Sequence, residues 1–451
     1  MKYAKTTLRL LAVVPFLLAL CVALIPAGAS AKVYIDLAAP ANRRLPIAVQ
    51  EFTYLGSAPQ PGSGHAREIA EIKAALRETL LSDLNFSELF NIIPREAYVE
   101  DPALSGLTYN ETNFSSWRVI GADTLVKGGF KVEGETLILE ARFFDCVTEK
   151  QVLGKRYVGS TKNPRRLAHY FADKLYEELT GQQGIFTTKL LFVSDRDGNK
   201  EVFMSDYDGQ NTSRVTSNKS INLSPQWSPE GTRVLYISYK RGTPSLYMLD
   251  LRSGRETPVS VREGINIAGR FSPDGRRVAL TLSGRKSPEL HILELGTFKD
   301  TQLTDNYAID VSPTWSPEGK KLAFVSDISG NPHIFMLDLA SRNIKRLTYN
   351  GVYNSSPAFS PDGRHIAYSR ADNGRFHIWV MKSDGKDPLQ LTFEGDNRSP
   401  SWSPDGRYII YSSTSREKSM LRIMRSDGSG ARTIKTGADN EKSPVWSPYL
   451  Q

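Results

Sequence analysis

The sequence predicts an α/β N-terminal domain followed by an all-β C-terminal domain, a six-bladed β-propeller of four-stranded blades closed by the C-terminal strand. Three observations predict this fold. A short phrase recurs six times at intervals of 43 or 44 residues, strand-like segments alternate with turns inside each interval, and residues 32–181 lack the repeat. Repeats of this length that contain four strands are typical of propeller blades.

The first 31 residues predict a secretory signal peptide. A basic start precedes an apolar run over residues 10–25, and the small residues Ala29, Ser30 and Ala31 follow it. The run is shorter than the ~20 residues that a membrane-spanning helix requires. We therefore expect export and cleavage after Ala31, with an uncleaved membrane anchor as the alternative.

Cleavage leaves one cysteine, Cys146, and therefore no intramolecular disulfide. We expect this thiol to pack in an apolar core rather than to act as a nucleophile.

Residues 32–44 are expected to form an extended segment for partner binding, and residues 45–181 a small α/β domain. Apolar residues at helical spacing predict a helix over 66–84, and Asn163-Pro164 opens a second helix over 165–179 that Gly181 ends. Alternating or apolar runs predict the strands 45–52, 90–93, 119–125, 130–132, 136–144 and 151–159.

The repeated phrase of residues 182–451 is an aromatic residue followed by Ser-Pro and, in five copies, by an acidic residue and Gly. Proline and glycine suit turns, and the aromatic residue is expected to fill space between blades. The last copy has no strands after it, while the strand at Lys189 has no copy before it. We therefore expect residues 443–447 to complete the blade that begins at Lys189, with an open solenoid as the alternative. The aromatic positions are Trp227, Phe271, Trp315, Phe359, Trp402 and Trp446.

The sequence contains no pattern for an enzyme active site. It has no Gly-x-Ser-x-Gly elbow and no glycine-rich phosphate loop, and its six histidines are not at metal-ligand spacing. The chain has 57 basic and 49 acidic residues, and the basic ones are not clustered in a run. This distribution argues against nucleic-acid binding. We expect no enzyme activity, cofactor or metal. The alternative is an enzyme or carbohydrate-binding propeller that uses channel aspartates such as Asp310 and Asp396.

The loops that enter the innermost strands of a propeller gather around one mouth of its central channel. These loops mix polar and apolar side chains on a rigid ring, which suits the capture of a peptide or a protein loop. Simple turn formation is the alternative for each single residue. The candidate binding residues are Ile265, Asn266, Ile267, Ala268, Asp310, Val311, Asn354, Ser355, Asn397 and Arg398.

Together, the signal peptide, the α/β domain, the six repeats and the terminal Trp446-Ser-Pro-Tyr-Leu450 resemble the TolB family, periplasmic propellers of the Tol-Pal system. One repeat departs from the pattern, because Gly269-Arg270 stands where the others have Pro and one further residue.

The resemblance implies a monomeric, non-enzymatic periplasmic scaffold that keeps the outer membrane intact and draws it inward at cell division. It implies that the peptidoglycan-associated lipoprotein Pal binds the propeller mouth at residues 265–268 and near Val311. It also implies that the inner-membrane protein TolA binds the mature N-terminus. The residues that match the TolA-binding segment are Val33, Tyr34, Ile35 and Asp36. The protein would reach the envelope membranes only through these partners.

Overall fold

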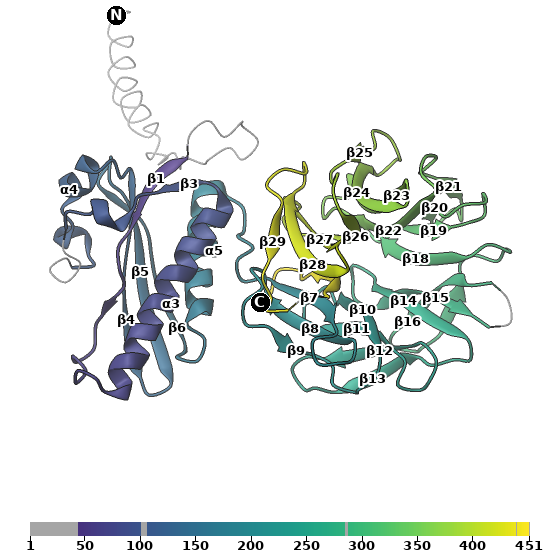
Figure 1. The fold of residues 1–451 in the computed structure, drawn as a ribbon, viewed down its shortest axis with the longest axis horizontal. Helices are drawn as coiled ribbons and strands as arrows, with labels where there is room; N and C mark the ends of the chain where they lie inside the picture. The colour runs from purple at the N-terminus through teal and green to yellow at the C-terminus, as the bar shows by residue number, and fades with distance from the viewer. Residues whose placement is uncertain (1–43, 101–105, 285–286, 439, 451) are drawn as a thin grey trace, which may run out of the picture.

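The N-terminal region of the computed structural model is a sheet packed against two long helices (Figure 1). The structure describes residues 44–450 except 101–105, 285–286 and 439, so the expected signal peptide and the segment around Val33 lie outside it. The strand order is β3-β1-β4-β5-β6, with β2 paired to β4. The strands are β1 (Leu45–Val49), β2 (Thr53–Tyr54), β3 (Phe90–Ile92), β4 (Thr124–Glu133), β5 (Thr136–Asp145) and β6 (Lys150–Ser160).

The two long helices are α3 (Gly64–Ser87) and α5 (Pro164–Thr180), and both begin where the sequence provides a cap. The Ser63 side chain accepts from the backbone N–H of Ala66, and Asn163 caps α5. Between them lie the short helix α4 (Phe114–Val119) and the 3-10 turns η1 (Arg95–Ala97) and η2 (Tyr109–Glu111). Among the described residues, no helix combines the length and the apolar composition needed to span a membrane.

The strand expected over residues 119–125 was wrong over most of its length. Val119 ends α4, and β4 begins only at Thr124. The β-branched Val119 and Ile120 favour a strand locally. However, Gly121 has a φ of 80° and its N–H bonds to the carbonyl of Arg118, which ends a helical turn there.

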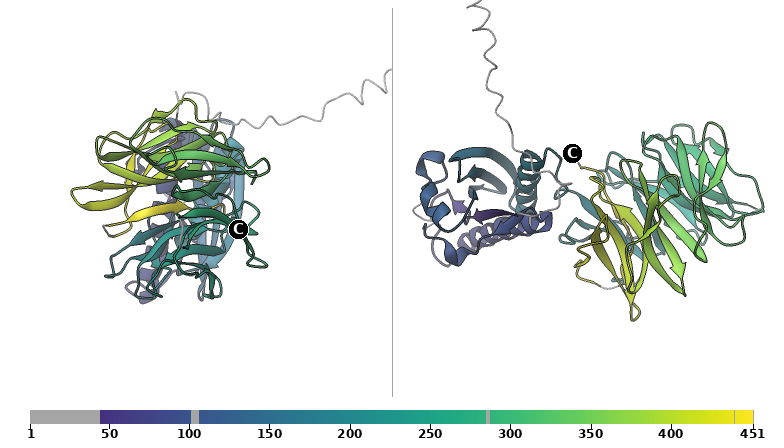
Figure 2. Two further views of the ribbon diagram at one scale, coloured as in Figure 1. Left: turned by 90° about the vertical axis from the view of Figure 1, so that its right-hand side faces the viewer. Right: turned by 90° about the horizontal axis from the view of Figure 1, so that it is seen from above.

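Residues 189–446 form six four-stranded sheets (Figures 1 and 2), and the innermost strands of all six line a central channel. Blade 1 is β30-β7-β8-β9, and blades 2 to 6 follow in chain order, which confirms the predicted closed propeller. The innermost strands are β30 (Lys442–Trp446), β10 (Asn222–Trp227), β14 (Ile265–Phe271), β18 (Asp310–Trp315), β22 (Tyr353–Phe359) and β26 (Asp396–Trp402).

The other strands of blades 1 to 3 are β7 (Lys189–Ser194), β8 (Glu201–Asp206), β9 (Ser213–Arg214), β11 (Arg233–Ser238), β12 (Ser245–Asp250), β13 (Glu256–Ser260), β15 (Arg277–Ser283), β16 (Glu289–Glu294) and β17 (Asp300–Gln302). Those of blades 4 to 6 are β19 (Lys321–Ser326), β20 (His333–Asp338), β21 (Ile344–Arg346), β23 (His365–Asp372), β24 (Arg375–Lys382), β25 (Leu389–Gln390), β27 (Tyr408–Ser415), β28 (Lys418–Arg425) and β29 (Arg432–Ile434).

The repeated aromatic residues join neighbouring blades. The Trp227 indole donates a hydrogen bond to the carbonyl of Val445 at 3.3 Å, and Trp402 donates to the carbonyl of Ala358 at 3.0 Å. The Ser of the phrase also acts within its own turn, since the Ser228 hydroxyl accepts from the N–H of Arg233 at 3.0 Å. The phrase is therefore structural, as the sequence predicts.

The N-terminal region and the propeller share one apolar core. The ring of Phe86, at the end of α3, packs 4.9 Å from both Tyr207 of blade 1 and Tyr408 of blade 6. The buried carboxylate of Asp83 accepts a hydrogen bond from Tyr207 at 2.7 Å. These contacts use the ends of the blades at which the innermost strands finish, because Tyr207 follows β8 and Tyr408 begins β27.

Candidate protein-binding mouth of the propeller

The opposite ends of the blades form a mouth, and the described residues of the N-terminal region contact the other ends instead. Each blade is an antiparallel meander, so the loop that enters an innermost strand and the loop between the second and third strands lie at the same end. We call the six entering loops, residues 215–221, 261–264, 303–309, 347–352, 391–395 and 435–441, the mouth loops.

Exposed apolar side chains gather on the mouth loops. Tyr307 is fully exposed, Phe393 is 74% exposed, and Val352 is 61% exposed. Isolated exposed apolar residues are common on soluble proteins, but contiguous groups of them mark interaction surfaces. Exposed large apolar residues occur on five of the six mouth loops or directly beside them: Ile221, Val261, Tyr307, Ile309, Tyr349, Val352, Tyr353 and Phe393.

The loops of blades 4 to 6 carry most of this apolar surface. Ile328, 58% exposed, lies in the loop between β19 and β20, and its neighbour Asp327 accepts a hydrogen bond from the N–H of Ile309 at 2.7 Å. The Asp327 bond therefore links two loops that each present an isoleucine to solvent.

A second apolar group surrounds Phe376. The Tyr353 ring lies 5.6 Å from it, and the guanidinium of Arg398 stacks 4.0 Å from its centroid. Aromatic and arginine side chains of this kind dominate the binding energy of many protein interfaces.

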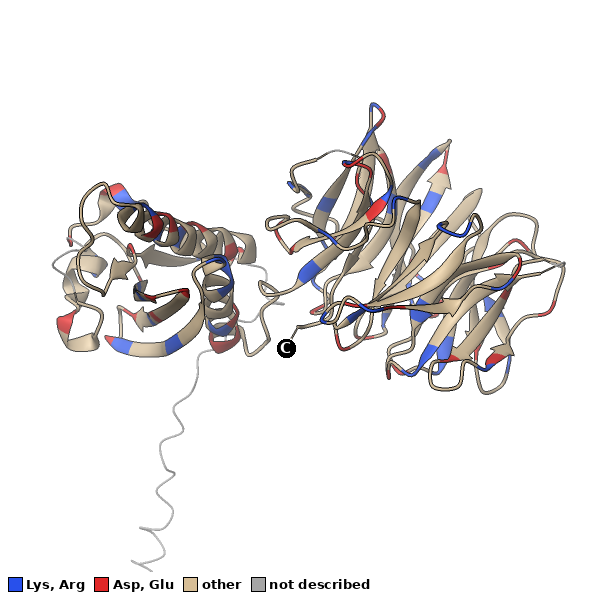
Figure 3. Ribbon diagram, turned by 90° about the horizontal axis from the view of Figure 1, so that it is seen from below, with Lys and Arg blue, Asp and Glu red and all other residues tan. Residues whose placement is uncertain are grey.

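Charged residues of both signs are distributed over the propeller (Figure 3), and some of those near the mouth form ion pairs. Arg262 donates to Asp300 at 2.7 Å, and Arg398 donates to Asp396 at 2.9 Å. The hydrogen bond from Arg262, with a further one from His291, lowers the pKa of Asp300 to about 2. This surface offers no single-sign field for nucleic acid.

A buried polar residue at or directly before the start of each innermost strand holds its mouth loop in place. Asn266 Oδ1 accepts from the Ser260 hydroxyl at 2.6 Å, and its Nδ2 donates to the carbonyl of Arg262 at 2.7 Å. Asp310 accepts from the Nδ2 of Asn306 at 2.9 Å. The equivalent residues are all buried: Asn222, Asn266, Asp310, Asn354, Asn397 and Glu441.

The channel itself is lined by all six blades and encloses about 490 Å³. Its lining includes neither Asp310 nor Asp396, so the pair of channel carboxylates required by the enzyme alternative is not there. Within the described ranges, no group of three or more His, Cys, Asp or Glu residues could hold a metal ion.

Comparison with known protein families identifies the family that has this architecture. The sequence model of the family described as TolB beta propeller domain matches residues 176–450, and that of the TolB amino-terminal domain matches residues 33–152. The chain belongs to the TolB family.

Curated relatives and a solved structure agree with this assignment. The TolB-family chain is 39% identical over 201 residues to the Tol-Pal system protein TolB of Desulfosudis oleivorans, which covers 44% of this chain and 43% of that protein. It is 39% identical over 213 residues to the Tol-Pal system protein TolB of Syntrophotalea carbinolica, 47% of each chain. The matches thus span just under half the length of these relatives.

The crystal structure of TolB from Acinetobacter baumannii superimposes with a TM-score of 0.75 at 25% identity, over 90% of this chain and 98% of that one. The family resemblance and the fold predicted from the sequence are confirmed.

The candidate residues named from the sequence occupy two environments in this TolB-family chain. Asn266, Asp310, Asn354 and Asn397 are buried behind the mouth loops, where they position neighbours rather than face solvent. The half-buried or exposed candidates follow or flank them: Ile265, Ile267, Ala268, Val311, Ser355 and Arg398.

Sequence reasoning missed the most exposed mouth residues, Tyr307, Tyr349 and Phe393. A local signal for two of them exists, because Leu-Thr precedes an aromatic residue in 347–349 and 391–393. The threonine hydroxyl accepts from an N–H of the third strand, as Thr392 does from Ile378 at 2.9 Å. The leucine and threonine are buried by this anchor, which leaves the following aromatic residue outside.

Proposed function

We propose that this chain is a non-enzymatic periplasmic scaffold of the Tol-Pal system. In this proposal the mouth loops bind the lipoprotein Pal, the segment from Val33 to Asp36 binds TolA, and the resulting link maintains the outer membrane and draws it inward at division. The proposal divides the mature chain into a partner-binding segment (32–44), an α/β domain (45–181) and the propeller (182–451).

The observation that carries the proposal is the group of exposed apolar side chains on the mouth loops. Burying exposed tyrosine, phenylalanine and valine side chains stabilises a complex by about 25 cal/mol for each Å² removed from water. The blade framework holds these loops rigidly, so little conformational entropy would be lost on binding. The relatives' names, which contain Tol-Pal, support a partner from that system.

The charge pattern supports a protein partner rather than a substrate. Ion pairs such as Arg398 with Asp396 sit beside the apolar group, as polar rims surround the apolar centres of protein interfaces. The channel lining offers no carboxylate pair for hydrolytic chemistry.

Hydrogen exchange with and without the purified soluble domain of Pal tests where the partner binds. We expect Pal to slow exchange in residues 303–309 and 347–352 and to leave β21 and β25, the outer strands of the same blades, unchanged. Protection confined to the outer strands or to the N-terminal region would reject the mouth as the Pal site.

The proposed binding of TolA is tested separately by deleting residues 32–36 from the mature chain. We expect this deletion to abolish co-purification with TolA while the Kd for Pal changes by less than about threefold. Undiminished TolA binding would reject the role of Val33 to Asp36.

A further inference from the structure

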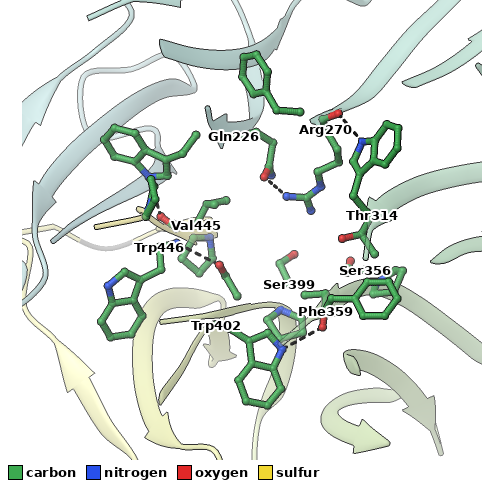
Figure 4. A pocket seen from close by; sticks show the side chains of 18 of the residues that line it. Gln226, Arg270, Thr314, Ser356, Phe359, Ser399, Trp402, Val445 and Trp446 are labelled. Carbon is green, nitrogen blue, oxygen red and sulfur yellow. Dashed lines mark hydrogen bonds between the residues drawn. The ribbon is translucent and has the colours of Figure 1, made fainter. Parts of the chain in front are cut away.

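One position in each innermost strand projects a side chain into the central channel. It lies directly before the repeated aromatic residue and just after a β-bulge. The six residues at this position are Gln226, Arg270, Thr314, Ala358, Ser401 and Val445, and Arg270 alone is charged (Figure 4).

Arg270 has no acidic partner within the described part of the chain. Its Nη1 donates to the side-chain oxygen of Gln226 in the next blade (Figure 4). The channel lining contains no aspartate or glutamate. Arg196, which is also mostly buried, is by contrast paired with Glu441 at 2.6 Å.

The position of Arg270 makes its lone charge costly. Burial, as the sole cause, lowers the pKa of its guanidinium to about 10, so the group still carries its positive charge at neutral pH. The Arg270 side chain is part-buried in the channel. A partly desolvated charge without a counter-charge destabilises a fold, and a bound anion relieves that cost. The guanidinium has five N–H donors, and Gln226 satisfies only a minority of them.

Hydroxyl groups line the same cavity. Each innermost strand bulges at a residue with a φ between 51° and 58°, and in five blades that residue is serine. These hydroxyls can donate to an anion in the channel. The bulge residues are Ser224, Ala268, Ser312, Ser356, Ser399 and Ser443.

We propose that the channel binds one small carboxylate anion, held by the guanidinium of Arg270 and by the serine hydroxyls of the bulges. A planar guanidinium matches a carboxylate through two parallel N–H···O bonds. The charges also match, since one arginine balances one carboxylate but leaves a doubly charged phosphate half neutralised. The cavity of about 490 Å³ accommodates acetate with room for water, which takes ~30 Å³ per molecule.

The test compares three proteins: the wild type, Arg270→Gln and Arg364→Gln. Arg270→Gln gives blade 3 the residue that blade 2 already carries at Gln226, so this variant is expected to fold. Arg364 lies in an exposed turn, with its side chain 81% exposed, and is the matched control. Circular dichroism and the elution volume establish that all three are folded.

Thermal unfolding is then measured in sodium acetate and in sodium chloride at equal ionic strength. We expect acetate to raise the Tm of the wild type and of Arg364→Gln by about 2 °C or more over chloride, because a ligand that binds the folded state stabilises it by mass action. Arg270→Gln should show no difference between the two salts. Equal Tm values in acetate and chloride for the wild type, or an acetate effect that survives in Arg270→Gln, would overturn the proposal.

Titration with the soluble domain of Pal distinguishes a free carboxylate from one that a docked protein supplies. This comparison rests on the proposed function, whereas the acetate experiment does not. If the channel binds a free anion, the Kd of Arg270→Gln for Pal should stay within about twofold of the wild-type Kd. If a carboxylate of Pal itself occupies the channel, the Kd of Arg270→Gln should be at least tenfold weaker. In that case added acetate should compete with Pal for the wild type and not for the variant.

Discussion

The indole Nε1 of Trp446 donates a 2.8 Å hydrogen bond to the hydroxyl of Thr188. The two residues are separated by almost the whole propeller, and Trp446 also pairs with Leu190 in the register of β30 and β7. Together with the pairing of β30 and β7, this contact closes the ring, and the arrangement of the mouth loops depends on that closure.

Trp446→Ala is expected to lower the free energy of unfolding by about 3–5 kcal/mol, because it removes a buried indole and its hydrogen bond. Urea unfolding measures the change. Phe393→Ala, at an exposed aromatic residue of the mouth, serves as the control and should stay within ~0.5 kcal/mol of the wild type. Equal stabilities of Trp446→Ala and the wild type would contradict closure through this strand.

Tyr207→Phe is expected to lower the free energy of unfolding by about 1–3 kcal/mol, since the buried carboxylate of Asp83 loses its 2.7 Å donor. Asp83 would keep only its contact with His169 Nδ1 at 2.8 Å. Tyr109→Phe, at a residue 46% exposed, is the matched control. Urea unfolding with no difference between the two variants would show that the Asp83 contact does not hold the propeller to the N-terminal region.

The pH dependence of stability is expected to include a contribution from Asp173. This carboxyl group accepts from the N–H of Phe186 at 2.8 Å, but burial outweighs its hydrogen bonds and raises its pKa to about 6. The folded state therefore keeps a proton that the unfolded state loses near pH 4. Stability should fall as the pH rises from about 4 to 6, by up to ~3 kcal/mol.

Urea unfolding at pH 4.5 and pH 7 checks this slope in the wild type and in Asp173→Asn. The variant should lose the part of the slope that belongs to Asp173, while contributions of other groups, such as His169, are common to both proteins. Identical slopes would show that the folded and unfolded pKa values of Asp173 are the same.

Cys146 is expected to resist thiol reagents in the folded protein. It is fully buried, and burial raises its pKa to about 12. Ellman's reagent at pH 8 should therefore modify no thiol until urea is added. Modification of one equivalent on mixing would contradict the burial of this residue.

The blades were predictable because each one repeats the same local physics. Ser-Pro with an acidic residue and glycine sets a turn, and the aromatic residue before it packs against the neighbouring blade. The offset between the strand at Lys189 and the phrase at Trp446 predicts closure, and the pairing of β30 with β7 confirms it. Because the pattern recurs six times, the copies together define the positions of the strands and turns even where a single copy is ambiguous.

Single elements without repetition were harder to predict. The strand expected at Val119 failed because a glycine turn outweighs the local preference of two β-branched residues. At the mouth, asparagine predicted the loop but not which side chain faces solvent, since Asn354 is buried while Val352 is 61% exposed. Burial of this kind depends on contacts between strands that are distant in sequence.

The role of Arg270 was predictable only in part. The departure from Ser-Pro at Gly269-Arg270 is visible in the sequence, but its consequence depends on the ring. Only closure of six blades encloses this side chain in a channel without a carboxylate.

Binding of Pal to mouth variants tests the central claim most directly. Isothermal titration calorimetry compares the wild type with Tyr349→Ser/Phe393→Ser and with Ile344→Ser/Leu389→Ser. The last two residues are exposed apolar side chains on the outer strands of blades 4 and 5, 47% and 57% exposed. We predict that the mouth variant weakens the Kd at least tenfold, or by about 1.4 kcal/mol, while the outer-strand variant stays within twofold. Equal affinity of the mouth variant and the wild type would contradict the claim that the mouth is the binding site.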